Sequence, residues 1–373
     1  MRLVIFLLFF ACSGNLSNAQ ELNEYRSIDN VAMNIPRSQS NSTHDIAVYV
    51  SAHFENESAR ARAIYSWVTT NIKYDKDSAN IINSDINPEA RITYALRRRK
   101  GVCENFAALF NDICLKAGIT SFVVSGYTKQ SGMVDKTGHS WCAVCIGKTW
   151  YLCDPTWDVG NSLNSKYFLV EPTEFIESHM PFDPLWQLLN YPVSHEQFYS
   201  GSLYKKNNTP YFNFSDSIAA YAQMDSMHKL QSTALRIQNY KLYNSLVKDN
   251  YNYVKMNIEI LGQDNDLELY NSSMEDLNDA TTILNNFVEY RNKQFTPPKT
   301  DEELQGLLNG VEDKLDSSLK KLDKVDKSQA TLTLGTEPVR TRLAILSKKI
   351  GEQKEFLKRY LNTDKSGRKL LFY

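Results

Sequence analysis

The sequence lacks an excess of charge of either sign and any long hydrophobic run. Its 42 Lys and Arg residues balance 43 Asp and Glu residues, for a formal net charge of -1. Charge therefore indicates neither nucleic acid nor an acidic membrane surface as a partner. No apolar stretch approaches the roughly 20 residues that a helix needs to span a bilayer. We expect no nucleic acid partner and no transmembrane segment.

Loops with calcium-site spacing and glycine-rich phosphate loops are also missing. Cys142 and Cys145 have the spacing of a zinc or redox pair. On a strand, however, residues three apart face opposite sides, so we exclude zinc at this pair. These absences lead us to expect no cofactor and no metal.

The first 20 residues have the pattern of a secretory signal. Arg2 precedes an unbroken apolar run from Leu3 to Ala11, and small residues at 17–19 follow it. This pattern predicts a signal peptide over residues 1–19 and an exported protein, periplasmic or extracellular, of a bacterial envelope. The alternative is a lipid anchor through Cys12, which is less favoured because Phe9 stands where such anchors usually have Leu.

Loss of that segment would leave five cysteines, an odd number in a compartment where disulfides persist. At least one thiol must then stay unpaired within the chain. That fits a nucleophile, although five free and mostly buried thiols fit the count equally well. The five residues are Cys103, Cys114, Cys142, Cys145 and Cys153.

A chain of 373 residues is long enough for one large or two moderate domains. Residues 20–44 are polar and predict a lightly structured lead-in. After about residue 214, Pro and Trp nearly vanish and long stretches of helix formers begin. We therefore predict a first domain over 45–214, with an aromatic and Pro-rich extension after residue 165, and an all-α helical domain over 215–373.

Helical signals occur in both predicted domains. Apolar residues at helical spacing predict helices over 57–72 and 103–117. In the second domain, Thr300 and Glu303 form a capping-box pattern, and Thr336-Glu337-Pro338 starts another helix. We expect three to five helices there, packed antiparallel.

Short β-branched and aromatic stretches predict strands over 120–127, 140–146 and 149–153. They are expected to form an antiparallel sheet packed on the helix that begins at Cys103. The first domain is therefore predicted to be α+β. The segment 165–201 is too often broken by proline to form long helices.

Cys103 has the setting of a reactive thiol. Gly101 permits a tight turn, and the helical apolar pattern begins just after the cysteine. A thiol at a helix N-terminus is stabilised as a thiolate by unpaired N–H groups and the helix dipole, to which Arg99 and Lys100 would add. A cysteine taken alone is more often a small core residue.

The strand hairpin gives Cys103 its partners. If Gly147-Lys148 forms a two-residue turn, Ile146 pairs with Thr149 and Trp141 lies opposite Asp154. Because side chains alternate between faces, His139 and Asp154 become diagonal neighbours on one face. A nucleophilic Cys, a His base and an Asp that orients the His are the groups that acyl transfer requires.

Three motifs containing these residues resemble the blocks of the transglutaminase-like superfamily, and the resemblance covers about residues 57–160. It implies a papain-like fold in which Cys103 is the nucleophile, His139 the base and Asp154 the third member. Two later segments resemble the extension of kyphoscoliosis-peptidase-type members. The three blocks are Gly101-Val102-Cys103, Gly138-His139-Ser140-Trp141 and 150–157, and the two segments are 167–169 and 179–186.

Further site residues are predicted around this group. The Cys103 backbone N–H is a natural oxyanion donor, and Tyr74 is a candidate for the second donor, with a core position as its alternative. Trp141, Trp157 and His179 are candidates to line the cleft. Calcium dependence, known in animal transglutaminases, is not carried over.

The cysteines outside this group admit two readings. In the proposed register Cys142 faces Cys153 across the hairpin, on the face away from His139. A cross-strand disulfide and two buried thiols both fit this placement.

The leading function is an exported thiol enzyme that cleaves or transfers amide acyl groups through a Cys thioester. Hydrolysis of a peptide or protein, such as one of the cell envelope, is favoured over cross-linking. The alternative is a catalytically idle scaffold in which the helical domain binds a protein partner.

Overall fold

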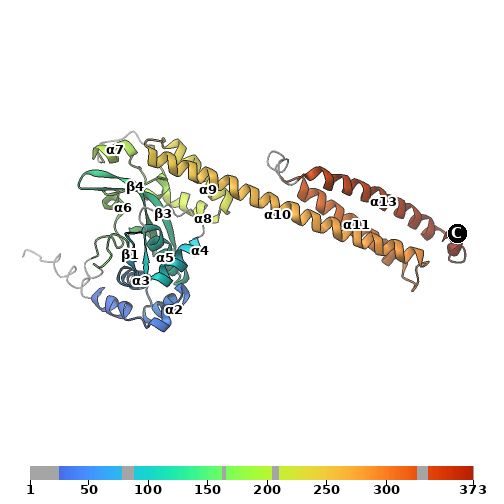
Figure 1. The fold of residues 1–373 in the computed structure, drawn as a ribbon, viewed down its shortest axis with the longest axis horizontal. Coiled ribbons are helices and arrows are strands. Elements are labelled where there is room, and N and C mark those ends of the chain that lie inside the picture. The colour runs from blue at the N-terminus through green and yellow to red at the C-terminus, as the bar shows by residue number, and fades with distance from the viewer. Residues whose placement is uncertain (1–24, 78–87, 162–164, 204–209, 326–334, 373) are drawn as a thin grey trace, which may run out of the picture. The chain divides into compact units, whose positions relative to one another are not determined.

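The computed structural model describes residues 25–77, 88–161, 165–203, 210–325 and 335–372 (Figure 1). The predicted signal peptide and Cys12 lie outside these residues. Backbone contacts divide the chain into two compact units, Met1–Lys255 and Met256–Tyr373. Among the described residues, no helix is both long and apolar enough to cross a membrane.

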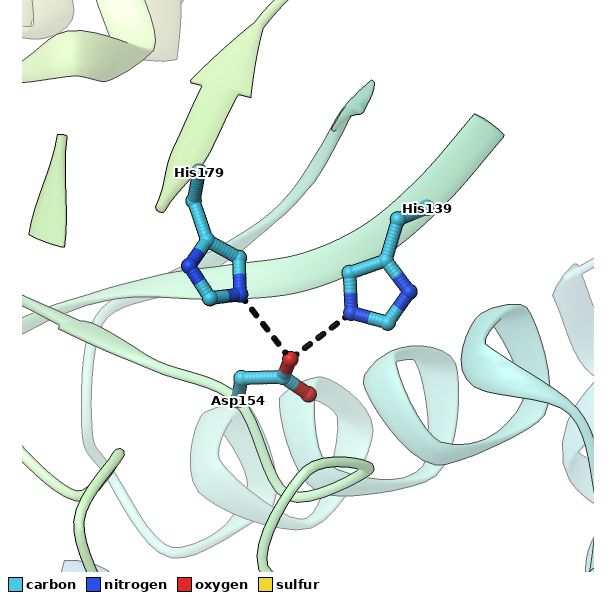
Figure 2. A group of neighbouring side chains, drawn as sticks. All are labelled: His139, Asp154 and His179. Carbon is cyan, nitrogen blue, oxygen red and sulfur yellow. Dashed lines mark hydrogen bonds and ion pairs between the residues drawn. The ribbon is translucent and has the colours of Figure 1, made fainter. Parts of the chain in front are cut away.

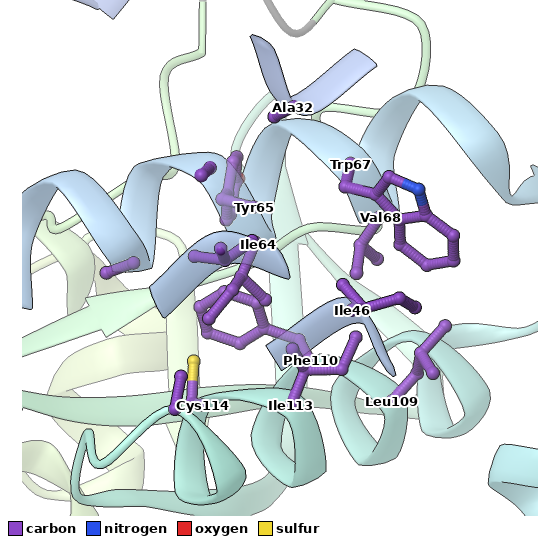
Figure 3. Packing of buried hydrophobic residues seen from close by; sticks show 14 of the residues in the cluster. Ala32, Ile46, Ile64, Tyr65, Trp67, Val68, Leu109, Phe110, Ile113 and Cys114 are labelled. Atoms are coloured by element: carbon purple, nitrogen blue, oxygen red, sulfur yellow. The ribbon is translucent and has the colours of Figure 1, made fainter. Parts of the chain in front are cut away.

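The core of the first unit is built on α5 (Cys103–Lys116). Its buried side chains pack against α2 (Thr43–His53) and α3 (Glu57–Asn71), as Figure 3 shows. Both of these helices have a side-chain N-cap, since Ser42 accepts from Asp45 N and Asn56 accepts from Ala59 N. The predicted helices at 57–72 and 103–117 are confirmed. Large buried members of this core are Ile46, Ile64, Tyr65, Trp67, Val68, Phe106, Leu109, Phe110 and Ile113.

Four antiparallel strands form the sheet, in the spatial order β5-β4-β3-β6. They are β3 (Ser121–Gln130), β4 (Met133–Ile146), β5 (Thr149–Cys153) and β6 (His179–Pro181). The predicted β4–β5 register is confirmed, because Ile146 pairs with Thr149 and Cys142 with Cys153. β3 and β4 are longer than predicted, because their outer ends carry polar residues with no apolar alternation to mark them.

Both faces of the sheet are covered. Cys142, Val144 and Cys153 belong to the same hydrophobic cluster as α5. The opposite face, with Trp141 and Leu152, belongs to a second cluster that includes residues after the sheet. Those residues come from short elements: α6 (Pro172–Phe175), 3-10 helix η3 (Pro184–Gln187) and α7 (His195–Ser200). The prediction that 165–201 has no long helix is confirmed.

A small parallel pair leads into α5. β1 (Lys73–Tyr74) pairs with β2 (Lys100–Gly101), so Tyr74 lies beside Gly101. The short helices η1 (Arg37–Gln39) and α4 (Pro88–Arg98) complete this part of the unit.

The prediction of a lightly structured lead-in over 20–44 is wrong for its described part. Residues 25–33 are helical, and Ile28 and Ala32 are buried in the core of the first unit. Asp29 forms a bidentate, buried ion pair with Arg62 of α3, with both N–O distances at 2.7 Å. Such a buried pair needs both partners, because either charge left alone would be costly to desolvate.

The first helices after residue 214 belong to the first unit. In α8 (Phe214–Gln223), Ile218 belongs to the hydrophobic cluster that contains Trp141 and Leu152. The ring centroids of Tyr221 and Trp186 lie 5.4 Å apart. In α9 (Ser226–Asn239), Arg236 forms a bidentate ion pair with Asp183. The contact division therefore falls after Lys255, inside α10 (Ser245–Asn292), and does not coincide with the change in composition at residue 214.

The second unit is helical. Ser273 of α10 and Ser318 of α11 (Asp301–Leu322) hydrogen-bond through their buried hydroxyls. Between α11 and α13 (Thr336–Asn362), Arg340 pairs with Asp323 and Lys354 with Glu312, so these two helices are antiparallel. The predicted capping box is present, since Thr300 and Glu303 exchange hydrogen bonds. A 3-10 turn, η4 (Arg368–Phe372), closes the described chain.

Candidate active site

Cys103 is the first residue of α5, as predicted, and is partly exposed. The turn before it is held by Asn105, whose Oδ1 accepts a hydrogen bond from Val102 N at 2.9 Å. A Cβ at Gly101 would lie 2.6 Å from Asn105 Cβ, so this close turn requires glycine. At a helix N-terminus the first N–H groups lack acceptors within the helix. This setting favours negative charge on Cys103.

His139 and Asp154 are in direct contact, as the hairpin register predicted. His139 Nε2 lies 2.7 Å from Asp154 Oδ2 (Figure 2). His139 comes from β4, where it pairs with Gly126 of β3, and Asp154 directly follows β5. Because Nε2 hydrogen-bonds to the carboxylate, Nδ1 is the ring nitrogen that can interact with Cys103.

The charge state of His139 follows from its two partners. Burial alone would lower its pKa, but the Asp154 carboxylate, through its charge and its hydrogen bond, and then the Cys103 side chain raise the pKa to about 10. The ring therefore holds its second proton at neutral pH. Cys103, His139 and Asp154 thus interact as a chain of three groups.

Asp154 is fully buried and heavily hydrogen-bonded. Its Oδ1 accepts from the backbone N–H groups of Thr156 and Trp157. Burial works against its charge, but interactions with His139 and then His179 hold its pKa well below the usual range. The carboxylate is therefore ionised and can stabilise an imidazolium on His139.

Tyr65 and Asp158 support the backbone at Asp154, and sequence analysis missed both. The Tyr65 hydroxyl from α3 lies 2.8 Å from the Asp154 carbonyl oxygen and 2.7 Å from Asp158 Oδ2. Both residues are buried. Tyr65 has the sequence pattern of a helix core residue, so no local signal marked its hydroxyl.

Tyr74 lies beside Cys103, because β1 places it next to Gly101. Its pKa is raised by partial burial and then by the charge of Cys103. The phenol therefore keeps its proton and can donate a hydrogen bond near the thiol. Its position agrees with the predicted role as second oxyanion donor, which stays a prediction.

The predicted cleft-lining residues differ in exposure. Trp157 is half-buried and its ring centroid is 5.9 Å from that of His139. Trp141 and His179 are each about 1% exposed, so neither lines an open cleft. The reason is the cover of the second sheet face by the segment after residue 165, which the sequence showed only as irregular.

His179 instead touches Asp154. Its Nε2 lies 3.2 Å from the same Oδ2 that His139 contacts (Figure 2). The ligand-type atoms of His139, Asp154 and His179 all lie within 4.8 Å of one another, a spacing that a metal ion could use. Hydrogen bonds within the group already account for this clustering.

The other four cysteines among the described residues are free thiols. Cys142 and Cys153 face each other across the hairpin, as predicted, without a disulfide. Burial raises the pKa of Cys114 and Cys142 well above the ordinary value and that of Cys153 to about 12. Cys145 is only partly buried, and its pKa is also raised by burial and then by Glu57.

Comparisons with known proteins agree with this fold. Residues 44–155 match the model of the transglutaminase-like superfamily, a range that includes Cys103, His139 and Asp154. Kyphoscoliosis peptidase of Mus musculus is 36% identical over 174 residues, which cover 42% of this chain and 25% of the relative. The Homo sapiens protein of that name is 35% identical over 172 residues, covering 41% and 25%. Hillarin of Drosophila melanogaster is 23% identical over 202 residues, covering 47% and 24%.

The matches thus span about a quarter of the length of these curated relatives. The chain carries a transglutaminase-like domain with an α+β, papain-like core, followed by a helix-rich C-terminal region. Two of these relatives are peptidases by name.

Proposed function

We propose that this protein is a thiol enzyme that cleaves amide bonds of a peptide or protein through a thioester on Cys103. The observation that carries the proposal is the hydrogen-bonded pair of His139 and Asp154, with Cys103 acting on the same imidazole. A structural histidine needs neither a buried, ionised carboxylate nor a partly exposed thiol beside it. The match to the transglutaminase-like superfamily supports this assignment.

The reaction follows from the placement of the three groups. The Cys103 thiolate attacks the amide carbonyl carbon, and the oxyanion that forms accepts from the Cys103 backbone N–H, with Tyr74 as the second donor. The C–N bond breaks as His139 donates its proton to the leaving amine. Water then attacks the thioester while His139 takes its proton, and the C–S bond breaks to release the acid product and restore the Cys103 thiolate and the His139 imidazolium. Asp154 stabilises the imidazolium and stays ionised throughout.

Hydrolysis is proposed over cross-linking, with water rather than an amine as the acceptor. Export to a cell envelope, expected from residues 2–19, makes envelope peptides or proteins the proposed substrates. Mass spectrometry of the protein isolated from its native cells tests this export, since cleavage after Ala19 would leave Gln20 at the N-terminus.

The test of the activity is a screen that separates the two acceptors. The protein is incubated with a library of amide peptides, including glutamine donors, with and without a primary amine, and products and acyl-enzyme are read by mass spectrometry. Hydrolysis predicts cleaved or deamidated peptide and a covalent adduct on Cys103, both absent from Cys103→Ala. Amine incorporation in place of hydrolysis would make the protein a transferase.

The scaffold alternative makes the opposite prediction. In that case no adduct forms on Cys103 with any peptide, and Cys103→Ala performs the cellular role of the wild type. Capture of a partner by residues 215–373 would then assign the protein to a binding function.

A further inference from the structure

We propose that His179 is a positioning residue, which donates its Nε2–H to Asp154 Oδ2 and keeps that carboxylate turned toward His139. The proposal rests on the proposed function of Cys103. Two imidazoles from different strands meet at one carboxylate oxygen, at 2.7 Å from His139 and 3.2 Å from His179 (Figure 2).

β6 places His179 where it can reach Asp154. Its pairing with β3 sets His179 opposite Thr128, and the ring is enclosed by aromatic side chains. The Phe175 ring stacks on the imidazole, with the two ring centroids 4.0 Å apart. The centroid of the Trp157 ring lies 4.4 Å from that of the imidazole. With about 1% exposure, the imidazole has no room to turn away from the carboxylate.

The hydrogen bonds define the tautomer of His179. Asp154 is ionised and can only accept, so the proton of the contact must be on His179 Nε2. Ser178 Oγ lies 2.7 Å from Nδ1, which can then accept the hydroxyl proton. Both ring nitrogens are thus satisfied in a neutral ring.

The charges around His179 are consistent with that neutral form. The groups that face it are the carboxylates of Asp154 and Asp135 and the imidazole of His139. Burial lowers the pKa of His179 to about 4, although Asp154 acts in the opposite direction. His179 is therefore uncharged at neutral pH.

A neutral donor suits this position better than a cation. Two backbone N–H groups already donate to Asp154 Oδ1. The hydrogen bond from His179 therefore fixes the position of the other carboxylate oxygen, Oδ2. A charged donor would neutralise the carboxylate and weaken its stabilisation of the imidazolium on His139. His179 supplies orientation and leaves the negative charge for His139.

The experiment compares His179→Phe, which keeps the ring packing and removes the donor, with His179→Gln, whose amide can still donate. The rate of iodoacetamide alkylation at Cys103 is measured from pH 5 to 9 by peptide mass spectrometry. We expect His179→Phe to lower this rate below pH 8 by about tenfold, as for loss of a hydrogen bond to a charged group. His179→Gln should restore most of it.

His195→Phe is the matched control. His195 is another buried histidine, 2% exposed and hydrogen-bonded to the Tyr127 hydroxyl at 2.8 Å. Its loss should alter thermal stability and leave the alkylation profile of Cys103 unchanged. Equal profiles for wild type and His179→Phe would overturn the proposal, as would equal effects of His179→Phe and His195→Phe.

Nitrogen-15 NMR of labelled histidines in the wild type gives a readout that needs neither catalysis nor a variant that folds. We expect His179 to be the neutral Nε2–H tautomer from pH 5 to 8. A protonated ring or an Nδ1–H tautomer at pH 7 would overturn the proposal. If that tautomer is found but Cys103 reacts no faster than Cys145, the proposed function fails and the positioning role fails with it, while the hydrogen bond stands.

Discussion

At the residue scale, the acyl-transfer groups could be read from the sequence because each carries a local signal. Cys103 stands where a helical pattern begins, and a two-residue turn fixes the register that joins His139 to Asp154. His179 and Tyr65 could not be assigned in the same way. Their contacts with Asp154 depend on β6 pairing with β3 and on α3 packing, and neither is a local property of the chain.

Tyr65 gives the first prediction. Tyr65→Phe removes a buried hydroxyl that lies within hydrogen-bond distance of Asp154 O and Asp158 Oδ2. We expect the free energy of unfolding to fall by about 1–3 kcal/mol, because a buried carboxylate loses a donor. Urea denaturation monitored by circular dichroism measures this change.

The control for that change is Tyr253→Phe, at an exposed position on α10. It should alter the free energy of unfolding by less than about 0.5 kcal/mol. If the two variants unfold at the same urea concentration, Tyr65 does not support Asp154 through its hydroxyl.

At the scale of the element, the start of α5 depends on one glycine. Gly101→Ala would place a Cβ 2.6 Å from Asn105 Cβ. The Asn105 side chain also accepts the hydrogen bond from Val102 N. The turn or the helix must then shift, at a cost of roughly 1–3 kcal/mol. We expect lower thermal stability together with slower alkylation of Cys103, because the thiol moves with the first helical turn.

Gly306→Ala on α11 is the matched control, since a Cβ there meets no atom within 4 Å. In a helix interior this change should be neutral or stabilise the protein by about 0.5–1 kcal/mol. Gly101→Ala with wild-type stability and wild-type alkylation would contradict the close-approach argument.

Elements were predictable from the sequence where an apolar pattern was continuous, as in α3 and α5, or where a capping box marked the start, as in α11. The helix over 25–33 was missed because the polar residues at 26, 27, 29 and 30 mask the helical spacing of the buried Ile28 and Ala32. One of those, Asp29, is itself buried, and its partner Arg62 lies 33 residues away. Because Asp29 is charged, the sequence of this buried helix resembles that of a solvent-exposed segment.

At the scale of the whole molecule, composition and packing give different boundaries. Helix formers dominate from residue 215, yet α8 and α9 belong to the first unit and cover its aromatic side chains. Tyr221 contacts both Phe122 and Trp186. Composition reports helix propensity, whereas a domain boundary depends on which surfaces are buried together.

This difference predicts the outcome of truncation. A chain that ends after Lys255 keeps α8 and α9 and should unfold in one cooperative thermal transition with Cys103 alkylation intact. A chain that ends after Phe214 exposes Phe122 and Trp186 and removes the partner of Asp183, which should cost on the order of 3 kcal/mol or more. Calorimetry of both proteins measures this difference, and equal melting temperatures would refute it.

The central claim is that the His139 imidazolium activates the Cys103 side chain as a nucleophile. Its most direct test is the pH dependence of iodoacetamide alkylation, followed at Cys103 and at the partly buried Cys145 in the same protein. Because interactions with Asp154 and Cys103 raise the pKa of His139 to about 10, the imidazolium persists throughout the neutral range and up to that pH. Cys103 should therefore react faster than Cys145 across this range, because the imidazolium interacts with its side chain.

In His139→Ala, the account predicts that the alkylation rate of Cys103 falls to about that of Cys145, whose own rate is unchanged. A Cys103 profile that is the same in wild type and in His139→Ala would contradict the account, because no working pair would then exist in the resting protein.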